Sequence, residues 1–296
     1  MIQTLFTICE QSLMHLPLML GAYMSFSLIK VPDLSIESAY VVGATLGSKI
    51  LIGMHGMPMG ITLFLVIAAS LIGGALVGLT SSLLTQKAKL PHLLSSIVTF
   101  GVFHGITHGI SQAYVSLSSI PSPLEIGIAT TQNPELPILI VIGVVVCMLV
   151  YFLLQTQLGF AFAVYGNNPQ FFKHYGISTT IIFIVGICMS NALAGLSGYL
   201  FAQSNNFIEL NMGLGKALLC ITALILGKSL MRSKKPIAIT IPIIGTFSYF
   251  TLQQLLLKIG FNLKYFTAMQ ACIVLIILIY TYRYTQRPQS NDNLGV

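Results

Sequence analysis

The chain has 296 residues, of which 55% are hydrophobic and only 7% are charged, and its mean hydropathy is +0.88. A soluble domain carries about a quarter charged residues, so seven acids and fourteen bases cannot cover a soluble protein of this size. The net charge of +7 does not indicate nucleic-acid binding, because the bases lie in short connectors between apolar runs. Composition therefore predicts a multi-pass protein of the lipid bilayer with no nucleic-acid partner.

Apolar runs of about 20 residues, the length of a transmembrane helix, recur along the chain and predict an all-α fold. We expect a polytopic transmembrane helix bundle of about 8–9 membrane segments, including a broken or re-entrant one near residues 30–52. The expected helices span residues 4–29, 36–52, 59–84, 91–114, 138–154, 180–203, 211–230, 237–257 and 265–284. We expect a single transmembrane domain over residues 1–287, followed by a disordered tail over residues 288–296.

The basic residues predict which side of the membrane each connector faces. Nine of the fourteen bases fall in connectors that alternating spans place on one side, which marks that side as cytoplasmic. These bases are Lys87, Lys89, Lys173, Lys228, Arg232, Lys234, Lys235, Arg283 and Arg287. The connector over residues 155–179 is then cytoplasmic, and the polar stretch 115–137, which has two acids and no base, is an expected external loop.

Between the first two helices, Pro32, Asp33, Ser35 and Glu37 predict an interrupted membrane segment. Pro32 lacks a backbone N–H and disfavours helix at the residue before it, so the first helix ends here, and Ser35 is the expected N-cap of the next helix. Acidic residues at membrane depth usually line a cavity or pathway. In a cytoplasmic loop, Asp33 and Glu37 would instead be solvated, and the sequence leaves both alternatives open.

The connector over residues 158–178 contains signals for a short helix. Asn168 followed by Pro169 is typical of a helix start, and Gly176 is typical of a helix end. The aromatic residues of this predicted helix are Phe171, Phe172 and Tyr175. An amphipathic helix of this kind lies on the lipid surface or docks in the groove of a partner protein, and spacing alone does not separate the two.

The segment over residues 190–203 carries small residues at helical spacing, which predicts a tightly packed helix face. Those residues are Ser190, Asn191, Ala194, Gly195 and Gly198. Asn191 and Gln203 are polar amides in or at the end of an apolar span. Each either ties neighbouring helices together or contacts a solute.

Metal and cofactor sites are not expected. His104 and His108 lie four residues apart on one helix face, as in a two-histidine metal site, but no acid lies between them and no third ligand is apparent. Buried, hydrogen-bonded histidines are the favoured interpretation. The five cysteines occur singly, without CxxC spacing, as small buried hydrophobic residues do.

Nucleotide-binding and catalytic motifs are also missing from the sequence. The stretch 213–216 ends in Gly-Lys but lacks the spacing and the hydroxyl residue of a phosphate-binding loop. No nucleophile elbow or catalytic trio is visible. The sequence therefore predicts a protein that is not an enzyme, and any ATP that it uses must bind another chain.

In combination, these motifs resemble the permeases of the branched-chain amino acid, ribose and tryptophan/tyrosine ABC importers, and most of all the last group. The matching features are a Ser25-Phe26 pair, the acidic core at 32–37, Gly43-Ala44, the 166–169 and 176–177 elements of the connector, the small-residue face ending at Gln203, 212–215 and Gly227. They occur in the family's order from about residue 20 to residue 230. The sequence departs from the family where Ser38-Ala39-Tyr40 replaces Gly-Ser-Phe and where Ser27 replaces a frequent base.

The resemblance implies a homodimeric permease of the bacterial cytoplasmic (inner) membrane, which forms the path for a small solute, such as an aromatic amino acid. It implies that a separate cytoplasmic ABC ATPase subunit hydrolyses ATP and that an extracytoplasmic solute-binding protein delivers the solute. The implied ATPase-coupling residues are Gly166, Asn167, Asn168, Pro169, Phe172 and Tyr175. The translocation-path residues are Asp33, Ser35 and Glu37, to which the sequence reading adds Asn191 and Gln203.

Two other interpretations stay open at this point. In an ion-coupled secondary transporter, Asp33 and Glu37 would be proton or cation sites. In a membrane-embedded enzyme, either these two acids or His104 and His108 would supply the chemistry. A docking helix favours the importer, because a secondary transporter needs no ATPase.

Overall fold

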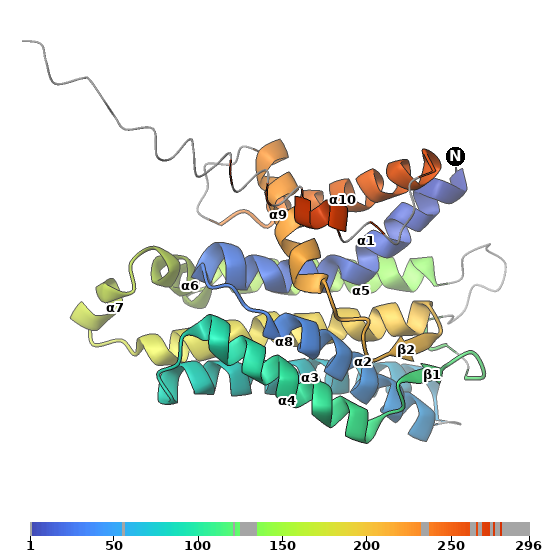
Figure 1. The fold of residues 1–296 in the computed structure, drawn as a ribbon, viewed down its shortest axis with the longest axis horizontal. Coiled ribbons are helices and arrows are strands. Elements are labelled where there is room, and N and C mark those ends of the chain that lie inside the picture. Colours follow the sequence, from blue (N-terminus) through green and yellow to red (C-terminus); the bar gives the residue numbers. More distant parts are fainter. Residues whose placement is uncertain are drawn as a thin grey trace, which may run out of the picture.

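The computed structural model describes residues 2–54, 57–120, 122–124, 135–231 and 237–260, together with 265, 268–272, 275 and 279. Most of its helices run in roughly the same direction, along the long axis of the molecule (Figure 1). The helices are α1 (Ile2–Ala22), the π-helix η1 (Tyr23–Ile29), α2 (Ser35–Gly53), α3 (Met59–Lys87), α4 (His92–Ile110), α5 (Leu136–Gln155), α6 (Gln157–Asn167), α7 (Gln170–His174), α8 (Thr179–Ser204), α9 (Lys216–Met231) and α10 (Thr240–Lys258). The predicted all-α bundle is confirmed.

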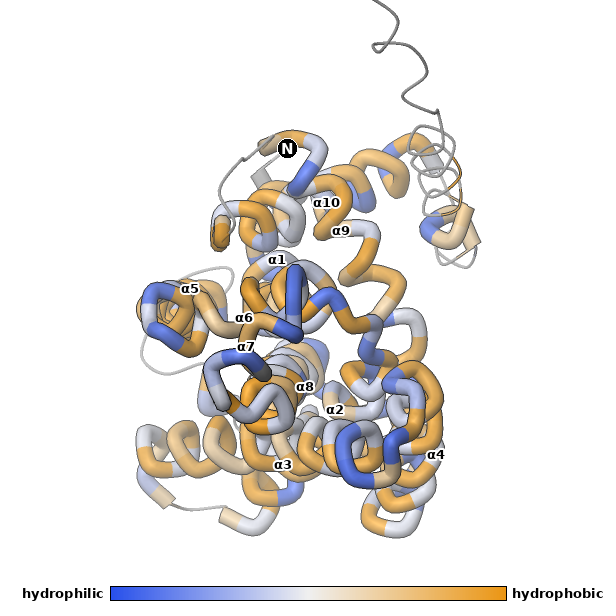
Figure 2. Tube along the Cα trace, turned by 90° about the vertical axis from the view of Figure 1, so that its left-hand side faces the viewer, coloured by the Kyte–Doolittle hydropathy of each residue, from blue (hydrophilic) through white to orange (hydrophobic). Residues whose placement is uncertain are grey.

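Five helical stretches among the described residues are long and apolar enough to cross a membrane. They are Gln3–Ile29, Met59–Lys87, His92–Ile110, Leu136–Gln155 and Thr179–Ser204. The outward faces of α3, α4 and α5 are apolar as well, which fits contact with lipid or with another membrane-embedded chain. Figure 2, which views the bundle from the α6–α7 end, shows hydrophobic residues on the outer helices.

Helix α8 lies at the centre of the bundle and packs against α1, α2 and α3. Small residues allow this close approach, as the sequence predicts. A Cβ at Gly198 would overlap the carbonyl oxygen of Tyr40 in α2, and a Cβ at Gly43 would overlap the backbone of Gly195. Only glycine fits at these crossings, so α2 and α8 pack backbone to backbone.

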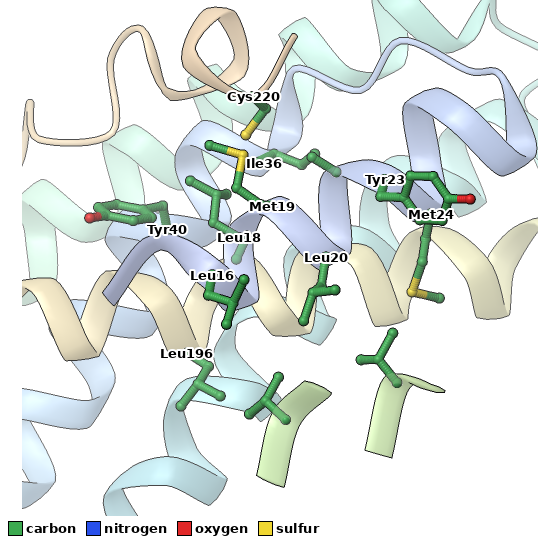
Figure 3. Packing of buried hydrophobic residues seen from close by; sticks show 14 of the residues in the cluster. Leu16, Leu18, Met19, Leu20, Tyr23, Met24, Ile36, Tyr40, Leu196 and Cys220 are labelled. Atoms are coloured by element: carbon green, nitrogen blue, oxygen red, sulfur yellow. The ribbon is translucent and has the colours of Figure 1, made fainter. Parts of the chain in front are cut away.

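The hydrophobic core forms around α1, whose side chains meet those of α2, α8 and α9 (Figure 3). The residues labelled there are Leu16, Leu18, Met19, Leu20, Tyr23, Met24, Ile36, Tyr40, Leu196 and Cys220. Helix α1 is therefore a central helix, with most of its apolar stretch buried inside the protein.

Several predicted boundaries differ from the structure. The connector over residues 155–179, which we predicted to be cytoplasmic, is largely helical, because α6 and α7 occupy most of residues 157–174. The helix expected to reach residue 114 ends at Ile110, and the next residues form β1 (Tyr114–Ser116), which pairs antiparallel with β2 (Phe207–Glu209). Helix α9 begins at Lys216, five residues later than expected, because a turn over residues 210–215 precedes it. The tail over 288–296 and most of the predicted helix 265–284 lie outside the described residues.

Candidate functional site

The chain reverses direction inside the bundle at the Asp33 segment. Helix η1 ends where Lys30 adopts a left-handed backbone conformation, with φ of 59°. Helix α2 then starts at Ser35, whose backbone N–H and hydroxyl both donate to Oδ1 of Asp33, at 2.9 and 2.6 Å. The prediction that Ser35 caps α2 is wrong: Leu34 occupies the N-cap position, and Asp33 satisfies the first backbone donor.

Asp33 also bonds to the centre of α8. Its Oδ2 accepts a hydrogen bond of 2.7 Å from Nδ2 of Asn191, and Oδ1 of Asn191 lies 3.2 Å from the Ser35 hydroxyl. On the far side, Nε2 of His92 lies 3.7 Å from Oδ1 of Asp33. Asp33 is 0% exposed, so the solvated-loop alternative does not apply to it. The sequence reasoning missed His92, and no local signal distinguishes it from any residue in the first turn of a helix.

Glu37 holds the start of α9 instead of joining this network. Its Oε1 accepts hydrogen bonds from the backbone N–H groups of Gly215 and Ala217, at 3.0 and 3.2 Å. N–H groups at a helix N-terminus have no acceptor within the helix, and a carboxylate is favoured there. Lys216 lies between the two donors, so Glu37 fixes the backbone from which the Lys216 side chain extends.

A cavity of about 500 Å³ opens between α1, α8, α9 and α10, towards the end of the bundle that carries β2. Its polar and aromatic lining includes Glu10, Gln11, His15, Phe201, Lys216 and Gln253. Nζ of Lys216 lies 3.0 Å from Nε2 of His15 and above the rings of Tyr40 and Phe201, at 4.9 and 4.7 Å from the ring centroids. Sequence reasoning missed this cavity, because its residues come from segments that are far apart in the chain.

Gln203, at the end of α8, is fully buried, and neither of its amide atoms has a hydrogen-bond partner among the described residues. It does not line the cavity described above. The structure thus joins Asp33, Ser35 and Asn191 into one network, while Glu37 and Gln203 lie apart from it.

The predicted coupling segment, which contains α6 and α7, lies at the opposite end of the bundle from β2 (Figure 1). Oδ1 of Asn168 accepts a hydrogen bond from the backbone N–H of Gln170 at 3.1 Å, and Gly176 has φ of 68°, as expected for the two ends of a short helix. Phe171 and Tyr175 are 46% and 68% exposed. Phe172 is only 5% exposed and packs into the core, so its side chain is not on the outer face of α7.

The coupling segment is fixed to η1. Nζ of Lys30 donates to the side-chain oxygen of Asn167, and Gly166 packs so closely on the carbonyl of Leu28 that a Cβ would overlap it. Helix α6 is therefore in direct contact with the segment that leads into Asp33.

The favoured interpretation of His104 and His108 as buried residues is wrong, because His104 is half-buried and His108 is exposed. Their rings meet edge to face with centroids 4.8 Å apart. Among the described residues, no cluster of three or more potential metal ligands is present.

By its fold, the chain is a multi-pass helical protein with the apolar surface of a membrane permease. A family model described as "Branched-chain amino acid transport system / permease component" matches residues 5–279, so the chain belongs to this family. It is a permease component of an ABC-type transport system.

Individual relatives agree with the family. The tyrosine transport system permease protein of Clostridioides difficile (strain R20291) is 31% identical over 247 residues, which cover 82% of this chain and 79% of that protein. The uncharacterized protein RP368 of Rickettsia prowazekii (strain Madrid E) is 31% identical over 226 residues, covering 76% and 77%. The autoinducer 2 import system permease protein LsrC of Escherichia coli (strain SMS-3-5 / SECEC) is 26% identical over 232 residues, covering 76% and 64%. No solved structure matches the chain.

Proposed function

We propose that this chain forms the translocation path of a bacterial inner-membrane ABC importer. Its solute is a small molecule, and we propose an aromatic amino acid. The chain works as a homodimer with two copies of a cytoplasmic ATPase, which hydrolyses the ATP, and an extracytoplasmic protein delivers the solute. The family supports the importer class, and the name of the Clostridioides difficile relative supports an aromatic amino acid.

The observation that carries the proposal is the direct packing of α6, which leads into α7, on η1 and on the adjoining Lys30. The exposed rings of Phe171, in α7, and of Tyr175, directly after it, lie 4.8 Å apart between centroids, and a bulky aromatic face of this kind suits the groove of a partner protein. ATP binding moves the docked α7, and α6 passes the movement to η1 and Asp33. The Asp33 break is the element at which α1 and α2 change their relative position.

Co-purification from the native membrane tests the docking. The wild-type chain is expected to bring down an ATPase in stoichiometric amount, identified by mass spectrometry and by its ATP hydrolysis. Tyr175→Asp introduces a charge into the docking face and is expected to remove most of that ATPase while the chain still inserts.

Tyr114→Asp is the matched control, because Tyr114 is also an exposed tyrosine, at 58%, but lies on β1 at the other end of the bundle. It is expected to retain the ATPase. Equal retention by both variants would contradict docking on α7, and a wild-type chain that purifies without any ATPase would instead favour an ion-coupled carrier.

A further inference from the structure

The ammonium of Lys216 reaches into the cavity and has one hydrogen-bond partner among the described residues. Nδ1 of His15 lies 3.0 Å from the carbonyl oxygen of Gln11, so the neutral ring donates there and its Nε2 accepts one hydrogen from Lys216. An ammonium has three hydrogens, and the described part of the chain uses one of them, which leaves two for a ligand. The nearby faces of Tyr40 and Phe201 stabilise the cation without neutralising it.

A carboxylate partner for this cation is missing from the described part of the chain. The only ion pair within 4.0 Å there joins His92 and Asp33, so no acid lies that close to Lys216. Glu37 bonds to the backbone on either side of Lys216, and Glu10 accepts a hydrogen bond of 3.0 Å from Ser204. A partly buried cation of this kind favours an anion supplied from outside.

The remaining lining indicates which kind of anion fits. A single cation suits a monoanion, whereas a phosphate dianion would need more donors. The aromatic rings of Phe201, Tyr249 and Phe250 line the same cavity and suit an apolar side chain. Side-chain amides, such as that of Gln253, whose Oε1 has no hydrogen-bond partner among the described residues, offer further polar contacts. The volume of about 500 Å³ is in the range of small-molecule sites.

We propose that this cavity is a solute subsite in which Lys216 binds the carboxylate of an amino acid during its passage through the permease. The inference rests on the proposed function and adds the place and the chemistry of solute recognition. Glu37 is a positioning residue, because it holds the first turn of α9 from which Lys216 extends.

The first experiment separates the two proposals. Native cells with and without the chain are supplied with radiolabelled amino acids, one at a time, and uptake is measured. Loss of uptake of at least one amino acid in the deletion strain supports the amino-acid importer and identifies the probe for the next step. Unchanged uptake of all of them overturns the amino-acid function and the subsite with it.

The second experiment tests the subsite alone. The permease–ATPase complex, without the solute-binding protein, is placed in lipid nanodiscs, and equilibrium binding of the labelled amino acid is measured. Wild type is expected to bind it saturably and to discriminate against the matching decarboxylated amine. Lys216→Gln is expected to bind about tenfold or more weakly, because a charge-assisted bond to a carboxylate is lost, and to lose the preference over the amine.

Lys228→Gln is the matched control, since Lys228 is on the same helix but outside the cavity. It is expected to bind as wild type does, and Lys216→Arg is expected to keep the preference for the carboxylate. Absence of saturable binding, equal binding of the amine by wild type, or normal binding by Lys216→Gln would each overturn the subsite and leave the importer function standing.

Discussion

Two polar regions, one around Asp33 and one around Lys216, lie inside the same apolar bundle and differ in how much of their bonding capacity the protein itself uses. Both oxygens of Asp33 accept hydrogen bonds from the chain, and the residue is fully buried. The Lys216 ammonium has a histidine and two aromatic faces for neighbours and opens into a cavity. In our proposal, a charge inside an apolar bundle is available to a solute where protein groups leave it unsatisfied, whereas a satisfied charge holds helices together.

The largest effect is expected from Asp33→Ala, which breaks the closed network. It removes the acceptor of the first donors of α2 and leaves Nδ2 of Asn191 with only the carbonyl oxygen of Ile187 to accept from it. Because unpaired buried polar groups are costly, we expect a loss of about 3 kcal/mol in the free energy of unfolding. Thermal denaturation of the purified chain in detergent measures it. An unchanged denaturation temperature would contradict a structural role for Asp33.

Asn191→Leu removes the α8 side chain from the same network. We expect it to lower the free energy of unfolding by about 2 kcal/mol. The double variant with Asp33→Ala is expected to cost less than the sum of the two single variants, because both remove the same hydrogen bond. A denaturation series of the four proteins measures the coupling. Strict additivity would show that the two residues do not act as one unit.

Glu37→Gln is expected to have a smaller effect on stability, about 1 kcal/mol or less. The amide oxygen of glutamine still accepts from the backbone at Gly215 and Ala217, and only the favourable charge at the start of α9 is lost. Solute binding is expected to weaken more than stability does, because Lys216 is held less firmly. Denaturation and nanodisc binding on the same preparation separate the two effects.

Lys216→Met tests directly whether the Lys216 charge serves stability or solute binding. Its effect on stability is expected to be the smallest of these variants. Removing this partly buried cation, which has no carboxylate within 4.0 Å in the described part of the chain, loses its contacts with the rings but also removes a desolvation cost. We expect the denaturation temperature to stay the same or to rise while solute binding is lost. A drop as large as that of Asp33→Ala would place Lys216 among the structural charges.

The class of protein and much of its local structure follow from sequence patterns alone. Apolar runs of membrane length predict the helices, Pro32 predicts the interruption before α2, and Asn168 and Gly176 predict the two ends of α7. The small-residue spacing in α8 predicts its close packing. These features depend on neighbours within about four residues, so a linear pattern contains the information needed to find them.

Which polar residues meet depends on the three-dimensional packing of the helices. Asp33 and Asn191 are 158 residues apart in the chain, and His15 and Lys216 are 201 apart, so no local pattern links either pair. The inward direction of Phe172 and the outward directions of Phe171 and Tyr175 depend likewise on how α7 packs on the rest of the bundle. Whether a charge becomes a structural bond or stays available to a solute is set by the helices around it, and their arrangement is a property of the whole fold.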